Sequence, residues 1–211
     1  MEEIDRLKIN ENQIWSESDP YTVERYIQIS KYCSEGNLIL EIGCNTGRGG
    51  AVLKSEIQKI DIIGLDIIQD RLNKIQSGIY NSLVCKSIHE FDSDLKFDRI
   101  IAGEVIEHIP EDEFELMLLK CKALLKDNGL MIFTTPNPES LLVRLGRNKV
   151  FNDPSHVNLM KISDFSKKIK NAGLRIIKLK GSGKMNRYLK NWPFMSLYGS
   201  YLSVLAKNSS K

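Results

Sequence analysis

The stretch "LILEIGCNTGRGG", residues 38–50, runs from a short apolar segment directly into a loop rich in glycine. A buried strand, such a loop and then a helix form the usual opening of a nucleotide-binding domain. The dinucleotide fingerprint G-x-G-x-x-G fails here, because counting from Gly43 it needs glycine where the chain has Asn45 and Arg48. The spacing G-x-G-x-G fits Gly43 and Gly47, with Asn45 between them. Asparagine adopts positive φ more readily than most non-glycine residues, so we expect the turn to form.

Apolar segments alternate with amphipathic ones along the rest of the chain. One helix is expected to begin at Asp19-Pro20, another to run from Pro110 to just before Gly129, and a third to cover 162–172. This alternation predicts an α/β fold, a Rossmann-like three-layer sandwich whose mostly parallel sheet is covered on both faces. Seven strands are predicted, at 38–42, 60–66, 82–85, 97–102, 130–135, 174–180 and 201–206.

Length and composition predict a single domain, residues 1–211, in the cytoplasm. The chain is 42% hydrophobic and 27% charged, as is usual for a folded domain. No window approaches the ~18 apolar residues of a membrane helix, and the polar start "MEEIDRLKIN" is unlike a signal peptide. The four cysteines are far apart in sequence, which predicts neither zinc nor disulfides and favours a reducing compartment.

The net charge of +3 is unevenly distributed. Residues 161–190 carry ten lysines or arginines and one acid, Asp164, a local charge of +9. Within this segment Lys184, Arg187 and Lys190 are spaced by three, as on one face of a helical turn, with Tyr188 and Trp192 beside them. The pattern predicts that this segment binds an anionic substrate, such as a phosphorylated or nucleotide-linked sugar, or RNA. The alternative is a solvated lysine-rich surface.

The ends of the first two predicted strands indicate the cofactor. Small residues in the loop Gly43-Cys44-Asn45-Thr46-Gly47 let backbone amides approach a ligand at a helix N-terminus. Asp66 ends the second strand, 19 residues beyond Gly47, where a carboxylate can accept both hydrogen bonds of a ribose diol. The loop therefore favours S-adenosylmethionine (SAM) over NAD.

Four segments in order resemble the class I SAM-dependent methyltransferases. They are "LILEIGCNTGRG", "IIGLDI", "FDRIIAGEVIEHI" and "LLKDNGLMIFTTPN", and together they cover about residues 37–137. The resemblance implies a seven-stranded sheet whose last strand, 201–206, is antiparallel. It also implies that the acceptor is bound by segments at about 136–160 and 181–196.

The same resemblance implies the cofactor-binding residues. Around the methionine end of SAM it places Glu41, Gly43, Cys44, Asn45 and Gly47. It assigns Asp66 to the ribose, Ile67 to the adenine face, Ser87 and Ile88 to the adenine rim, and Gly103 and Glu104 to the methyl end. Where the family often has an acid near the adenine amine, this chain has Lys86-Ser87.

Two of the three histidines are candidate catalytic residues. Methyl transfer from SAM needs mainly in-line positioning and exclusion of water, with a general base where the acceptor must lose a proton. His108 follows the fourth predicted strand, near the expected methyl position, and His156 lies in an expected acceptor wall. The alternative for each is a structural role, and His89 is expected at the surface.

The string E-x-x-E-H is compatible with a metal site, which the sequence neither predicts nor excludes. Glu104, Glu107, His108 and the later His156 offer two carboxylates and two imidazoles, a donor set that suits a divalent ion. Small-RNA 2′-O-methyltransferases and ubiquinone-pathway O-methyltransferases look similar in this stretch, although relatives without metal share the string.

These features predict a SAM-dependent methyltransferase directed at a hydroxyl rather than an amine. The acceptor is left open among a sugar or glycan precursor, a quinone-like ring and an RNA end. One alternative is a non-catalytic SAM-binding regulatory subunit, which the presence of both candidate histidines disfavours. A short-chain NAD oxidoreductase is disfavoured because none of the seven tyrosines has lysine four residues later.

Overall fold

The computed structural model describes residues 21–146, 153–183, 188 and 193–208, and contains one seven-stranded sheet in the order β3-β2-β1-β4-β5-β7-β6. Parallel pairing joins the first five strands of this order, with β1 between β2 and β4. The last strand in the chain, β7, pairs antiparallel with both β5 and β6, as the resemblance implied. The strands are β1 (Leu38–Ile42), β2 (Asp61–Asp66), β3 (Ser82–Cys85), β4 (Phe97–Gly103), β5 (Leu125–Pro136), β6 (Leu174–Ser182) and β7 (Ser200–Lys207).

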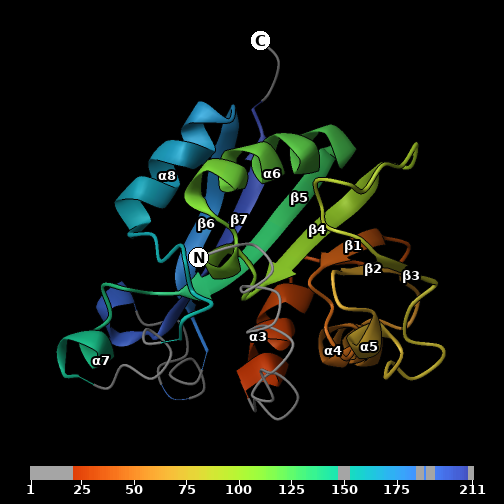
Figure 1. Ribbon diagram of the computed structural model, residues 1–211, viewed down its shortest axis with the longest axis horizontal. Helices are drawn as coiled ribbons and strands as arrows, with labels where there is room; N and C mark the ends of the chain where they lie inside the picture. Colours follow the sequence, from red (N-terminus) through yellow and green to blue (C-terminus); the bar gives the residue numbers. More distant parts are fainter. Residues whose placement is uncertain (1–20, 147–152, 184–187, 189–192, 209–211) are drawn as a thin grey trace.

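Helices cover both faces of the sheet, which confirms the three-layer prediction (Figure 1). One core cluster joins the sheet to α6 and α8, and the other joins its opposite face to α3 and α4. The helices are α3 (Tyr21–Ser30), α4 (Arg48–Glu56), α5 (Gln69–Leu72), α6 (Glu111–Leu124), α7 (Leu141–Arg144) and α8 (Ile162–Asn171). Two short 3₁₀ helices are η1 (Ile106–His108) and η2 (Met195–Leu197). Within the described ranges no helix has the length and apolar character needed to cross a membrane.

The end of α6 differs from its prediction. We expected this helix to continue to just before Gly129, but it ends at Leu124 and β5 begins at once. Leu125 is buried and pairs with Phe97 at the start of β4. Lys126 forms an ion pair with Asp98 at 2.9 Å. Tertiary pairing with β4 therefore overrides the local helical pattern in this segment.

The parallel strands place their carboxyl ends at one edge of the sheet. The predicted site residues lie at the ends of β1, β2 and β4 or in the segments that follow the five parallel strands at this edge. The helix α3 lies on the face beside this edge and is tied to β6: Gln28 donates to the Gly181 carbonyl at 3.2 Å and accepts from Ser182 Oγ at 2.7 Å. The fold thus brings residues from 25 to 200 around one edge of the sheet.

Candidate functional site

The turn between β1 and α4 has three residues with positive φ. Gly43 has φ 70°, Asn45 has φ 50° and Gly47 has φ 83°, which confirms the expectation that asparagine can stand in the middle position. A Cβ on Gly43 would lie 2.5 Å from Cγ2 of Val105, so close packing as well as φ excludes larger residues there. This turn connects the carboxyl end of β1 directly to the start of α4 at Arg48.

Asp66 fixes this turn to the end of β2. Its Oδ2 accepts a hydrogen bond from the backbone amide of Asn45 at 2.8 Å, and its Oδ1 accepts from that of Ile68 at 3.0 Å. The side chain is buried, and burial raises the pKa of the carboxyl above its usual value. The next side chain, Ile67, is 44% exposed, which leaves an apolar surface beside the carboxylate. A carboxylate has about four acceptor positions, so Asp66 retains at least one beyond those used by the amides of Asn45, Ile68 and Ile67.

The two residues predicted at the adenine rim differ in their surroundings. Ser87 is half-buried in a tight turn, where its hydroxyl donates to Glu90 Oε2 at 2.9 Å. Ile88 is buried in the core cluster that contains Leu65, so any contact it makes with a ligand would come through its backbone. Cys44 is also buried, with Sγ close to the position that a Cβ on Gly64 would take.

Glu41 is buried at the end of β1 and accepts two hydroxyl hydrogen bonds. Tyr26 Oη donates to its Oε1 at 2.6 Å, and Tyr80 Oη donates to its Oε2 at 2.8 Å. Burial raises the pKa of Glu41 to about 7, the two tyrosine hydrogen bonds oppose this increase, and the nearby Asp66 adds to it. Burial thus opposes the charged form of this carboxyl, and the two tyrosine hydroxyls favour it.

Glu104 follows β4 with φ 56°, a conformation that costs a non-glycine residue strain. Its backbone amide donates to the Thr134 carbonyl at 2.9 Å. Its Oε2 lies 3.3 Å from Nη2 of Arg25 on α3 and accepts from Ser200 Oγ at 3.4 Å. Its other oxygen, Oε1, is buried and has no hydrogen-bond partner among the described residues. At the carboxyl edge of the sheet, this oxygen can therefore accept a hydrogen bond from a ligand.

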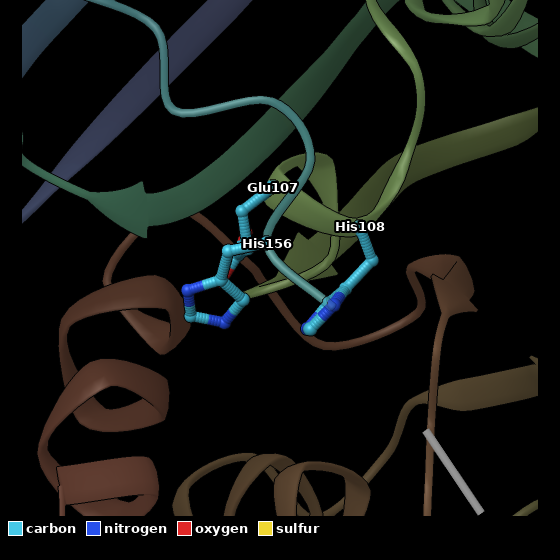
Figure 2. A group of neighbouring side chains, drawn as sticks. All are labelled: Glu107, His108 and His156. Carbon is cyan, nitrogen blue, oxygen red and sulfur yellow. The ribbon is translucent and has the colours of Figure 1, made fainter. Parts of the chain in front are cut away.

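Glu107, His108 and His156 form a second cluster at this edge (Figure 2). Each offers one ligand atom, and these atoms all lie within 4.8 Å of one another. The two imidazole rings meet edge to face with centroids 4.8 Å apart. Glu107 is buried, and its Oε2 accepts from Thr135 Oγ1 at 3.0 Å. Burial and the neighbouring Glu104 hold the pKa of Glu107 well above its usual range.

The tautomer of His108 follows from its contact with a backbone carbonyl. Its Nδ1 lies 3.1 Å from the Ser155 oxygen, and since a carbonyl only accepts, Nδ1 carries the proton and Nε2 is left as an acceptor. Burial and the adjacent His156 lower the pKa of His108 to about 4. His108 is therefore neutral at pH 7. A base with so low a pKa is poorly matched to proton abstraction at neutral pH, whereas a neutral imidazole is what a metal ion requires.

The cluster suits a divalent cation in part. The buried Nδ1 of His156 has no hydrogen-bond partner within the described part of the chain, so this ring can turn a nitrogen toward a ligand. A carboxylate with two imidazoles is a donor set common to several transition-metal ions. Glu104, the fourth candidate, lies with Arg25 and Ser200 and does not belong to this group. The structure thus brings together three of the four candidate ligands.

Several polar partners were not predicted from the sequence. They are Arg25 beside Glu104, Tyr26 and Tyr80 on Glu41, and Thr135 and Ser155 beneath the histidine cluster. Gly49 and Gly50 were a usable signal, because two glycines inside a helix indicate close approach by bulky neighbours.

The predicted basic face falls mainly outside the described residues. Lys184, Arg187, Lys190 and Trp192 lie there, and only Tyr188, 66% exposed, is described. Of the other basic residues in 161–190, Lys168 is paired with Glu111 at 3.1 Å and with Glu115 at 2.9 Å. Part of the local positive charge is therefore neutralised by α6.

Comparison with known proteins gives one family match. A family model described as "Methyltransferase domain" matches residues 15–179. A ubiquinone biosynthesis O-methyltransferase of Bradyrhizobium diazoefficiens is 31% identical over 112 residues, which is 50% of this chain and 42% of that protein. The chain thus spans well under half the length of this relative.

Solved structures show the same fold. A SAM-dependent methyltransferase from Clostridium acetobutylicum superposes with a TM-score of 0.70 at 14% identity, covering 98% of this chain and 99% of that one. The small RNA methyltransferase HEN1 gives 0.67 at 23% identity over 91% of this chain and 26% of that one. At these identities the likeness concerns the fold alone.

The titration of His108 tests the geometry of the cluster. We expect its ring proton signals, assigned by their loss in His108→Gln, to shift with a midpoint near pH 4 in an NMR titration. The pKa of a histidine in an unfolded chain is near 6.5. Because the pKa of His108 is lower in the folded protein, the neutral ring contributes its full stabilisation above about pH 6.5. This stabilisation is lost as the pH falls from about 6.5 to about 4. A midpoint near 6.5 would show that the ring is not held as described.

Proposed function

Because the chain belongs to the methyltransferase-domain family, we propose that it transfers the methyl group of SAM to a hydroxyl of a small-molecule acceptor. The observation that carries this proposal is the adjacency of two sites at the carboxyl edge of the sheet. The turn that ends β1 supports a nucleotide-like cofactor, and Glu107, His108 and His156 lie beyond β4 at the same edge. The acceptor class is suggested by the relative named as an O-methyltransferase.

For the cofactor we propose the residues at the ends of β1, β2 and β4. Gly43, Cys44, Asn45 and Gly47 would present the backbone of the turn to the methionine end, with Glu41 beneath them. Asp66 would accept from the ribose hydroxyls through its remaining acceptor positions, and the exposed Ile67 would pack on adenine. Ser87 and the backbone of Ile88 would border the adenine, and Gly103 and Glu104 the methyl end.

The chemistry at the acceptor follows from the same geometry. SAM, when bound, supplies an activated methyl group with a good leaving group, so the chain has mainly to position the acceptor oxygen and exclude water. Glu104 Oε1 has no hydrogen-bond partner among the described residues, and His108 Nε2 is left as an acceptor by the contact of Nδ1 with Ser155, so either atom could accept the hydrogen bond of an acceptor hydroxyl. We propose His156, beside His108, as the second catalytic histidine.

A divalent cation is the second candidate for this cluster. Glu107, His108 and His156 would hold it, and it would lower the pKa of a bound acceptor hydroxyl, which would remove the need for a strong protein base. The low pKa of His108 favours this role over that of a general base. An acceptor with two neighbouring hydroxyls, such as a quinone-pathway phenol or an RNA 3′ end, would chelate such an ion.

The charge of the acceptor remains part of the proposal. The excess of lysine and arginine in 161–190 supports an anionic acceptor, including a phosphorylated sugar, a glycan precursor or RNA, although Lys168 is already paired.

We assign the acceptor walls to residues 136–160 and 181–196 of a single domain, and place the reaction in the cytoplasm. A non-catalytic SAM-binding subunit would bind cofactor with no turnover in any acceptor class.

The role of Asp66 is tested by calorimetry with S-adenosylhomocysteine, the demethylated product. Asp66→Ala should weaken binding by about 1.5–3 kcal/mol, the usual value for hydrogen bonds to a charged group, while NAD should show no binding to either protein. Asp61→Ala is the matched control, since Asp61 lies at the opposite end of β2 and its carboxylate accepts from Asn81. Equal affinities for Asp66→Ala and the wild type would remove Asp66 from the ribose site.

The histidines and the cation are tested by turnover across acceptor classes. His108→Ala and His156→Ala should each lose about 10²–10⁴ in turnover while still binding cofactor, and His89→Ala, altered away from this cluster, should not. Losses below threefold for both would leave positioning by other residues as the mechanism. Exhaustive chelation separates the two roles: loss of activity that added Mg²⁺ or Mn²⁺ restores supports the cation, and unchanged activity excludes it.

A further inference from the structure

The carboxylate of Glu41 is held from two sides by tyrosines of different elements. Tyr26 reaches Oε1 from α3, which precedes β1 in the chain, and Tyr80 reaches Oε2 from the segment between α5 and β3. A carboxylate that accepts a hydroxyl on each oxygen can neither rotate nor tilt without losing a charge-assisted hydrogen bond. Glu41 therefore has one fixed orientation directly below the turn that begins at Gly43.

The glycines at the start of α4 make this arrangement possible. A Cβ on Gly49 would lie 2.2 Å from Cζ of Tyr26 and 2.5 Å from Oε1 of Glu41. A Cβ on Gly50 would lie 2.5 Å from Oη of Tyr80. Glycine inside a helix weakens the helix relative to alanine, so Gly49 and Gly50 lower the stability of the first turn of α4. The absence of a side chain at these two positions allows both tyrosine rings to reach the Glu41 carboxylate.

The position of α3 depends on polar contacts with the same edge of the sheet. Besides the Tyr26 hydrogen bond, α3 makes polar contacts with this edge through Arg25 to Glu104 and through Gln28 to Gly181 and Ser182. A Cβ on Gly103 would lie 2.9 Å from Tyr26 Oη, so this hydroxyl also lies beside the end of β4. The hydroxyl of Tyr26 thus lies beside β1 and β4, two of the three strands whose ends form the proposed cofactor site.

We infer that Tyr26 and Tyr80 are positioning residues that orient Glu41 under the cofactor turn, and that the Tyr26 bond couples the docking of α3 to cofactor binding. This inference rests on the proposed function. Coupling is reciprocal, so a cofactor that favours the ordered turn must also favour docked α3. The other ionisable groups near Glu41 are Asp66, which raises the pKa of Glu41, and the Cys44 thiol, whose own pKa is raised by burial and by Glu41. The two tyrosine hydroxyls therefore stabilise the Glu41 carboxylate against burial and the charge of Asp66.

The test is hydrogen exchange of the full chain, with and without S-adenosylhomocysteine, together with calorimetry of the same ligand. In the wild type the ligand should slow amide exchange across residues 21–30. Tyr26→Phe should bind the ligand about fivefold or more weakly, and the ligand should no longer slow exchange in α3. Tyr80→Phe should weaken binding to a similar degree but retain the ligand-dependent slowing in α3. Tyr32→Phe is the matched control, because phenylalanine keeps the aromatic ring that packs under Lys180 and removes only a hydroxyl. This variant should match the wild type in both measurements.

A second variant separates positioning from loss of stability. Gly49→Ala adds helical propensity to α4 but drives Tyr26 from Glu41, so it should bind the ligand more weakly even though α4 gains propensity. The double variant with Tyr26→Phe should bind no more weakly than the worse single variant. Wild-type affinity and wild-type α3 slowing in Tyr26→Phe and Gly49→Ala would overturn the inference. Failure of the wild type itself to bind would overturn the proposed function as well.

Discussion

The backbone of the turn between β1 and α4 is the constraint on which the site depends. Three of its five residues have positive φ, and the turn is closed from below by the Asp66 carboxylate on the Asn45 amide. Because β1 lies between β2 and β4 in the sheet, its end determines where the ends of those two strands can contribute side chains. Gly43 packs against Val105, so the position of the turn also influences where η1 begins.

Buried carboxyl groups are the second feature of the site. Glu41, Asp66 and Glu107 are each nearly inaccessible, and burial raises the pKa of all three. Each is hydrogen-bonded: Glu41 by tyrosine hydroxyls, Asp66 by backbone amides and Glu107 by Thr135. Burying such groups opposes folding unless donors compensate, and their concentration at one edge of the sheet supports the proposed ligand site.

Local sequence was sufficient to predict the strands and the turn, whereas the antiparallel direction of the last strand came from the family resemblance. Strand positions followed from runs of apolar residues, and positive φ at Asn45 followed from the spacing of Gly43 and Gly47. The boundary between α6 and β5 did not follow, because the pairing of Leu125 with Phe97 is a tertiary contact. Positive φ at Glu104 likewise has no local signal, since glutamate rarely adopts it.

Sequence proximity was also a partial guide to the site. The sequence offered Glu107, His108 and the later His156 as joint candidate ligands, and the structure brings these three together although nearly fifty residues separate His156 from the other two. The string E-x-x-E-H also suggested that Glu104 joins them, but its side chain lies with Arg25 on α3. Tyr26 and Tyr80 could not be assigned to Glu41 from sequence, because only the folded chain brings three distant elements to one carboxylate.

A crystal structure of the protein with S-adenosylhomocysteine would test the central claim most directly. The account predicts that the ribose hydroxyls lie within about 3 Å of the Asp66 carboxylate, with the adenine against Ile67 and the homocysteine over the turn that starts at Gly43. The sulfur should then point toward Glu104 and the cluster of Glu107, His108 and His156. A ligand bound elsewhere, or a ribose turned away from Asp66, would contradict the account.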